Sequence, residues 1–122
     1  MSKLVVLMIE IEQPEGLSAR KLVLETAKHN VINAYSGKSG LKLLARFPNV
    51  DAVVVHAHIT DMALEDITRH IKAAYPSMPV IVLSPNAQAE WYKPADYVVD
   101  SFVPHDILQL FAEKFGGDVE NE

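Results

Sequence analysis

Side chains that could carry acid–base or nucleophilic chemistry stand directly after short apolar runs in this sequence. His56, Ser84 and Asp100 each follow a run of valine, isoleucine or leucine residues. Unbroken runs of this kind are typical of strands that are buried on both faces of a parallel sheet. In open α/β sheets, ligands bind just beyond the carboxyl ends of the strands. We therefore expect these three side chains at one edge of a sheet, with Glu10 following the first apolar run nearby.

A hydroxyl, an imidazole and a carboxylate are the parts of a hydrolytic triad. In that hypothesis Ser84 is the nucleophile, His56 its base and Asp100 the group that orients the base. The sequence contains neither a nucleophile-elbow motif nor a glycine-rich loop that would supply an oxyanion hole. The chain is therefore not expected to be an enzyme, and a hydrolase remains the weaker alternative.

His56 and His58 form a His-x-His pair that could bind Zn2+. Two histidines at the end of one strand still need a third ligand, and the spacing does not show which residue would supply it. We therefore predict no metal and no cofactor, with these two histidines as weak metal candidates. The chain has no cysteine, so it offers no thiolate ligand or nucleophile.

The segment Ser36–Gly40 reads SGKSG and superficially resembles a phosphate-binding loop. It lacks the leading glycine at the required spacing, and it follows the second predicted strand, not the first. We interpret the segment as a turn that starts a helix.

The elements that must position these side chains are read from periodicity. Five apolar runs predict strands at 3–9, 31–35, 52–55, 80–83 and 97–99. Helical spacing predicts helices at about 14–29, 41–47, 62–75 and 104–115, with only 86–94 left for a shortened fourth crossover. The second of these helices would direct Phe47 inward, and the third would direct His70 and Ala74 inward. The fold class is therefore α/β: a doubly wound, five-stranded parallel sheet of the flavodoxin-like type, (β/α)5, with a shortened fourth helix.

Length and charge limit the remaining choices. The chain has 122 residues, which is one domain, and we expect it to span residues 1–117 with an acidic flexible tail at 118–122. The net charge is −5 without a basic cluster, which argues against nucleic acid and anionic membranes as partners. No apolar stretch approaches the roughly 20 residues of a membrane-spanning helix, and no signal-peptide pattern is present, so a cytoplasmic protein is expected.

The sequence resembles the receiver domain of bacterial two-component response regulators, of the kind found in chemotaxis regulators. The resemblance is carried by DAVVVHAHITDM followed by IKAAYPSMPVIVLSP, and by Tyr97 with Phe102 near the last strand. It covers about a hundred residues in the family's order. It implies a signalling module that receives a phosphoryl group on an aspartate with the help of Mg2+.

Departures from the family's pattern fall on the phosphorylation site. The positions of the acidic pair after the first strand fall on Met8 and Ile9, and Glu10 comes one residue late. The position of the phosphoacceptor aspartate falls on His56. Mg2+ requires oxygen ligands in octahedral geometry, which a thioether, an alkyl chain and an imidazole do not supply. The resemblance therefore implies a degenerate site.

The remaining site positions are also changed. The family's lysine position falls on Asp100, and only the hydroxyl position is kept, as Ser84. This arrangement predicts an imidazole at position 56 that pairs with the carboxylate of Asp100. A carboxylate beside an imidazolium would raise the pKa of His56 above its reference value of about 6.5, unless burial cancels the shift. Stability from the pair would then be present below that reference and lost as the pH rises through the folded pKa.

Aromatic residues near the shortened crossover are candidates for partner binding. Trp91, Tyr92 and Tyr97 lie in or beside it, and aromatic residues are favoured anchors of interfaces. The alternative is that Trp91 covers a sheet edge left bare by the short helix. We predict a stand-alone pseudo-receiver that binds another signalling protein, with a possible homodimer through the face formed by the fourth helix, fifth strand and fifth helix. The runner-up is a phosphorelay protein that uses unorthodox chemistry at His56.

Overall fold

A computed structural model describes residues 4–11, 29–85, 95–100 and 104–115 of the chain. The strands are β1 (Val5–Ile9), β2 (Asn30–Ala34), β3 (Ala52–His56), β4 (Val80–Ser84) and β5 (Tyr97–Asp100). The helices are α2 (Gly37–Arg46), α3 (Leu64–Ala74) and α4 (Pro104–Phe115). The predicted first helix and the shortened fourth helix lie outside the described residues, as does the predicted tail. None of the described helices is both long and apolar enough to cross a membrane.

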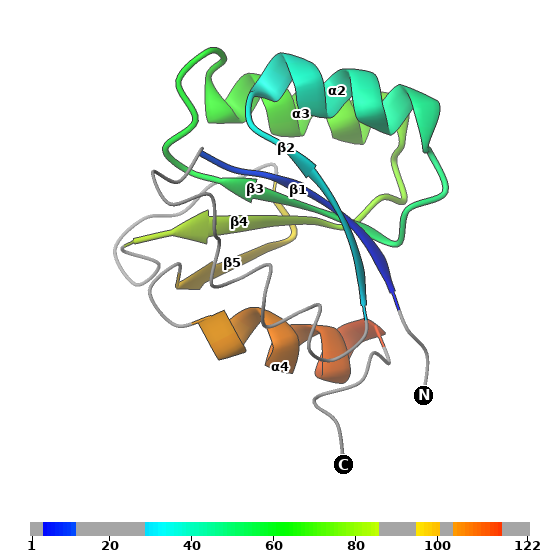
Figure 1. The fold of residues 1–122 in the computed structure, drawn as a ribbon, viewed down its shortest axis with the longest axis vertical. Coiled ribbons are helices and arrows are strands. Elements are labelled where there is room, and N and C mark those ends of the chain that lie inside the picture. The colour runs from blue at the N-terminus through cyan, green and yellow to red at the C-terminus, as the bar shows by residue number, and fades with distance from the viewer. Residues whose placement is uncertain (1–3, 12–28, 86–94, 101–103, 116–122) are drawn as a thin grey trace.

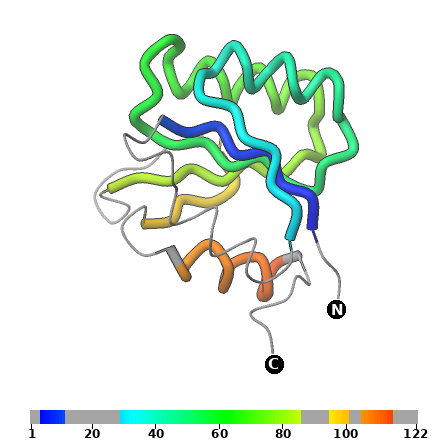
Figure 2. Tube along the Cα trace, in the orientation of Figure 1, coloured from blue at the N-terminus to red at the C-terminus, as the bar shows by residue number. Residues whose placement is uncertain are grey.

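The strands form one sheet in the order β2-β1-β3-β4-β5, and every neighbouring pair is parallel. In Figure 1, α2 and α3 lie together on one face of this sheet, and α4 lies on the other. Figure 2 shows the same arrangement as a tube, with β2 and β5 at opposite edges of the sheet. The predicted doubly wound, flavodoxin-like parallel sheet is confirmed.

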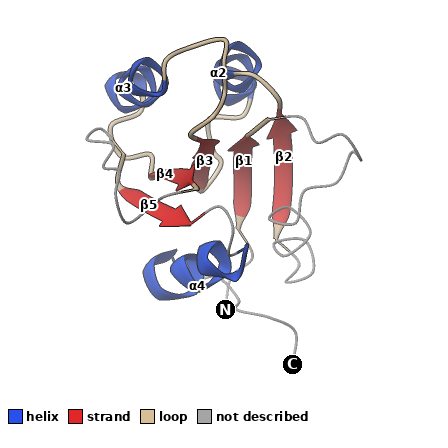
Figure 3. Cartoon of the chain, turned by 90° about the vertical axis from the view of Figure 1, so that its left-hand side faces the viewer, coloured by secondary structure: helices blue, strands red, loops and turns tan. Residues whose placement is uncertain are grey.

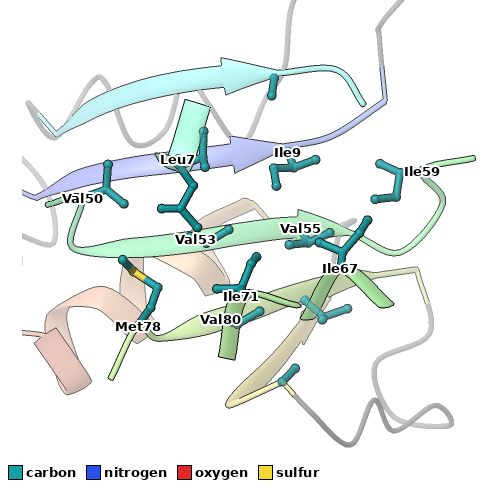
Figure 4. Packing of buried hydrophobic residues seen from close by; sticks show 14 residues of the cluster. Leu7, Ile9, Val50, Val53, Val55, Ile59, Ile67, Ile71, Met78 and Val80 are labelled. Carbon is teal, nitrogen blue, oxygen red and sulfur yellow. The ribbon is translucent and has the colours of Figure 1, made fainter. Parts of the chain in front are cut away.

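Each face of the sheet has its own apolar core, because side chains along a strand alternate between the two faces. Under α2 and α3, Leu7 and Ile9 of β1 pack with Val53 and Val55 of β3 (Figure 4). Under α4, the alternate residues of the same strands pack around Phe111. The central strands β3 and β4 are buried along their whole length. Their unbroken apolar runs are therefore explained by burial on both faces.

Polar side chains fasten the amino ends of the strands. Buried His29 accepts the Leu4 N–H through Nδ1 at 2.9 Å, and Asp51 accepts the Val5 N–H at 2.8 Å. At the other side of the sheet, one carboxylate oxygen of Asp96 accepts the N–H of Val80, the first residue of β4, at 2.8 Å. The same oxygen is 3.0 Å from the Lys72 ammonium, which also donates to the Met78 carbonyl. These side chains serve the fold, because each holds a strand start.

The first turn of α2 explains the SGKSG segment. Ser36 is the N-cap residue and its hydroxyl accepts the Ser39 N–H at 3.0 Å. The N–H groups of Gly37 and Lys38 are donated to the two carboxylate oxygens of Asp61, at 2.7 and 3.0 Å. The N–H groups at this helix start are therefore occupied by the protein itself. The interpretation as a helix-starting turn is confirmed.

Several predicted boundaries and faces were wrong. β2 begins at Asn30, which was expected to end a helix, and stops at Ala34. Phe47 is 45% exposed. It is the C-cap residue of α2, so the helix ends at Arg46, before position 47 could take its place on the buried face of the helix. In α3, the buried positions are Ile67, Thr68 and Ile71, while His70 and Ala74 are exposed. Thr68 is buried at no cost in unpaired groups, since its hydroxyl lies 3.1 Å from the carbonyls of Leu64 and Glu65.

Candidate functional site

Four predicted site residues stand at the carboxyl ends of the strands. Glu10 follows β1, whereas His56, Ser84 and Asp100 are the last residues of β3, β4 and β5. Glu10, His56 and Ser84 are buried, and Asp100 is partly buried. In Figure 3, the arrowheads mark the carboxyl ends of the strands, which these residues follow or end.

The strand register separates the four residues into two pairs. Ile9 is paired with Val55, so the next residues, Glu10 and His56, follow side by side. Because Ile9 and Val55 face α2 and α3, alternation directs Glu10 and His56 to the α4 side of the sheet. Ser84 is paired with Asp100, and both fall on the opposite parity from Leu83 and Val99, which face α4. The carboxylate nearest to His56 along the register is therefore that of Glu10.

The imidazole of His56 has a defined orientation. Its Nδ1 accepts the backbone N–H of His58 at 3.0 Å. The ring of His58 lies edge-on to that of His56, with 5.4 Å between the ring centroids. An Nδ1 that accepts a hydrogen bond carries no proton, so the neutral ring is protonated on Nε2. Forming an imidazolium would break the bond to His58.

Comparison with solved structures identifies the fold. A receiver domain from Clostridium thermocellum is 26% identical, covers 85% of this chain and 87% of its own, and has a TM-score of 0.72. A CheY-like receiver from Methanospirillum hungatei is 21% identical, with coverages of 94% and 95% and a TM-score of 0.74. The chain has the receiver fold. The CheX–CheY–BeF3–Mg complex from Borrelia burgdorferi is 18% identical, with coverages of 92% and 89% and a TM-score of 0.77. No family model and no curated protein matches the sequence.

In this receiver fold, Met8 and Ile9 are core residues of β1 and not part of a polar site. Both are completely buried, Met8 under α4 and Ile9 under α2 and α3. Ile9 also fills the space against Gly40 of α2, where an added Cβ would lie 2.6 Å from the Ile9 Cγ1 atom. The apolar chemistry of these two positions is therefore used for packing at the end of β1. Glu10 is the first polar residue that β1 brings to the edge.

The predicted pair between His56 and Asp100 stays a prediction. β4 lies between β3 and β5, so the two backbones are two strand spacings apart, about 10 Å. The side-chain parities also differ, as described above. The proposed triad with Ser84 would have to reach across the same gap.

A metal site is not assembled among the described residues. No three histidine, aspartate or glutamate residues within 4–11, 29–85, 95–100 and 104–115 come close enough to hold an ion. The weak candidates His56 and His58 are instead joined through a backbone N–H. Asp61, which follows them, caps α2, and its two backbone hydrogen bonds from Gly37 and Lys38 lower the pKa of its carboxyl below the usual value of 3.8.

The partner-binding candidates divide between described and undescribed residues. Trp91 and Tyr92 lie outside the described residues. Tyr97 begins β5, is partly buried and packs against the core beneath α4. A groove of about 320 Å³ runs between β5 and α4, and the residues that line it include Asp106 and Glu113 of α4 and Asp100 at the end of β5. Sequence reasoning missed this acidic groove, because the groove forms only where α4 packs against β5.

Proposed function

We propose that this chain is a pseudo-receiver: a signalling module with the receiver fold that does not undergo Mg2+-dependent aspartyl phosphorylation and acts by binding another protein. The observation that carries the proposal is the environment of His56 at the end of β3. This buried imidazole takes the phosphoacceptor position implied by the resemblance, and its Nδ1 is engaged by the backbone N–H of His58. A hard cation would find nitrogen there, where it requires oxygen.

The charge distribution of the edge supports the same proposal. Asp100 brings a negative charge to the strand end where the resemblance places a lysine. A phosphoryl group on His56 or on a neighbouring side chain would add negative charge to this edge, beside the side chain of Glu10. The positions that hold Mg2+ and the lysine in the family's reaction are thus taken here by an imidazole and a carboxylate. Neither group would stabilise a bound phosphoryl group.

The proposed partner surface is the groove between β5 and α4. Its apolar lining by Val99 and Leu110 is flanked by Asp106 and Glu113 of α4, which favours a partner that presents basic side chains around an apolar contact. Two copies of this chain that met through this groove would bring carboxylates together. The proposed partner is therefore a different protein, and a homodimer through this face is not favoured.

Phosphorylation is tested by incubating the chain with acetyl phosphate and Mg2+ and measuring its intact mass, with a phosphorylatable receiver domain in the same tube as a positive control. We expect the control to gain a phosphoryl group and this chain to gain none. Beryllofluoride with Mg2+, a stand-in for the phosphoryl group, should likewise leave the amide NMR spectrum unchanged. An adduct that disappears in His56→Ala would overturn the proposal in favour of the phosphorelay alternative.

The assignment of the surface is tested by sedimentation over a range of concentrations. A monomer throughout is expected from the like charges that face each other in a dimer of this kind. The Asp106→Lys variant is then mixed with the unchanged chain. If the mixture forms a dimer more strongly than the unchanged chain alone, the groove is an interface between two copies, contrary to the proposal.

A further inference from the structure

A second groove lies at the opposite edge of the sheet, between β2 and α2. Its volume is about 470 Å³, and its lining combines the end of β2, at Asn33 and Tyr35, with one face of α2 that includes Lys42, Leu43 and Arg46. Tyr35 is 50% exposed, although it is aromatic. β2 is the last strand of the sheet on this side, as Figures 2 and 3 show.

The outer edge of β2 presents backbone groups in a fixed pattern. Asn30 donates its N–H to Leu4 of the β1 side, and Ala34 accepts the Glu10 N–H there. In a parallel ladder, the N–H and C=O of one residue point to the same neighbour, and those of the next residue point away. Asn30, Ile32 and Ala34 therefore bond to β1, whereas the backbone groups of Val31 and Asn33 point to the outer edge, where no described strand pairs with β2. Such an edge can accept a further strand.

The helix beside this edge carries two cations that the described part of the protein does not neutralise. Lys42 and Arg46 are exposed, and neither takes part in an ion pair; the described ion pairs join Asp66 with Arg69 and Lys72 with Asp96. The guanidinium of Arg46 lies over the Phe47 ring, 5.8 Å from its centroid. In a chain of net charge −5, this is a local concentration of positive charge. The groove therefore favours an acidic ligand.

The spacing of the cations fits an extended peptide. Lys42 and Arg46 are four residues apart on α2, which corresponds to about 6 Å along the helix axis. Alternate residues of a strand, which share a face, are about 6.6 Å apart. We propose that this groove, lined by Asn33, Tyr35, Lys42 and Arg46, binds an extended acidic segment of a partner protein, which adds as a strand to β2 and places two alternate carboxylates against Lys42 and Arg46. This inference is independent of phosphorylation and of the groove between β5 and α4.

Other occupants fit less well. A small anion would use the cations but not the backbone groups of Val31 and Asn33. The start of α2 is closed to it, since Asp61 and Ser36 already occupy the N–H groups there. A second copy that paired β2 with β2 would bring the four cations of two grooves together.

The binding test uses a blocked peptide of alternating valine and glutamate, with a peptide of alternating valine and lysine as the control. Both are titrated into the full chain labelled with 15N. We expect the acidic peptide alone to shift the amides of β2 and α2, and the binding to weaken as the ionic strength rises from about 0.05 M to about 0.3 M. Free glutamate at the same carboxylate concentration should not reproduce these shifts.

Amide hydrogen exchange distinguishes strand addition from simple charge attraction. With the acidic peptide bound, exchange should slow at Val31 and Asn33, whose N–H groups face the open edge. The protection of Ile32, whose N–H already bonds to β1, should stay the same. A uniform change along β2, or a change in α2 alone, would overturn strand addition.

Two variants test the contacts separately. Lys42→Glu combined with Arg46→Glu should weaken binding by about tenfold or more, whereas Lys114→Glu, an exposed cation on α4, should leave it nearly unchanged. Asn33→Pro removes an outward N–H and blocks the edge, which an edge strand tolerates, and should abolish binding. If that variant unfolds, the charge reversals and the exchange pattern still decide. Equal weakening by Lys114→Glu, an absence of binding, or a β2-paired dimer in sedimentation would each overturn the proposal.

Discussion

The two ends of the sheet use polar side chains differently. At the amino end, His29, Asp51 and Asp96 each accept a backbone N–H that begins or precedes a strand. At the carboxyl end, Glu10 and His56 stand together at the tips of the strands. The first group supplies acceptors for N–H groups at the strand starts, whereas the second places titratable groups together at one edge.

This difference separates stability from function along each strand. A strand start needs its first donors satisfied, because a buried unpaired N–H costs about 1–3 kcal/mol. A strand tip in a parallel sheet is where a site can vary without loss of the ladder. The amino end should therefore respond to substitution mainly through the free energy of unfolding, and the carboxyl end mainly through what it binds. Four substitutions compare what individual side chains near the two ends contribute to stability.

The largest effect is expected for Asp96→Ala. It removes the acceptor of the buried Val80 N–H and the partner of Lys72, whose ion pair is partly exposed at 27% and 37%. The expected loss is about 2–3 kcal/mol, mostly from the unpaired N–H. Urea denaturation measures it. Asp66→Ala is the matched control, because it removes an exposed ion pair with Arg69 and should cost about 0.5 kcal/mol or less. Similar losses in both variants would contradict the role of Asp96.

A smaller loss is expected for Gly40→Ala, which tests how tightly α2 packs against Ile9 at the carboxyl end of β1. The new Cβ would meet Cδ1 and Cγ1 of Ile9. Overpacking costs about 1–3 kcal/mol and is offset by about 1 kcal/mol of helix propensity, so a net loss of about 1 kcal/mol is expected.

The double variant with Ile9→Val removes Cδ1 and should recover part of that loss. A double-mutant cycle from urea denaturation measures the coupling. Additive losses would show that Ile9 and Gly40 do not constrain each other.

A gain in stability is expected for Asn33→Val, because Asn33 lies near the carboxyl end of β2 and its amide does not contribute hydrogen bonds to the described part of the fold. Both polar atoms of the Asn33 amide are buried near the end of β2, and neither has a hydrogen-bond partner among the described residues. Replacement by a β-branched apolar residue should stabilise the chain by about 1 kcal/mol, seen as a higher urea midpoint. Asn30→Val, at an exposed position of the same strand, is the control and should change little. A loss of stability would show that the amide is satisfied.

The smallest effect belongs to Asp61, which lies near the carboxyl end but serves the fold. Hydrogen bonds from Gly37 and Lys38 lower the pKa of its carboxyl below 3.8. Its contribution is therefore fully present above the unfolded pKa and lost as the pH falls through the folded pKa. Asp61→Ala should cost about 0.5 kcal/mol at pH 7, at the low end for helix caps, because its carboxylate is exposed. NMR titration of the carboxyl measures the pKa, and a value at or above 3.8 would contradict the capping role.

Much of the fold follows from local sequence. The runs that form β1, β3 and β4 are apolar without interruption, and only burial on both faces of a parallel sheet satisfies such runs. The closing helix at Pro104–Phe115 was also predicted with its bounds. Boundaries were less predictable where two local signals competed, as at Asn30, which suits a helix end by composition but begins β2.

The sequence by itself determined which residues stand at the strand tips, because the position of a polar residue after an apolar run is a local property. Only the tertiary structure decided which of them are neighbours: strand order and register set Glu10 beside His56 and Ser84 beside Asp100. The groove with Lys42 and Arg46 is also decided by packing, here of α2 beside the end of β2, although its lining residues all lie within 33–46. Contacts between distant segments depend on how the strands pair, and pairing is fixed by the burial of the whole sheet and not by any one segment.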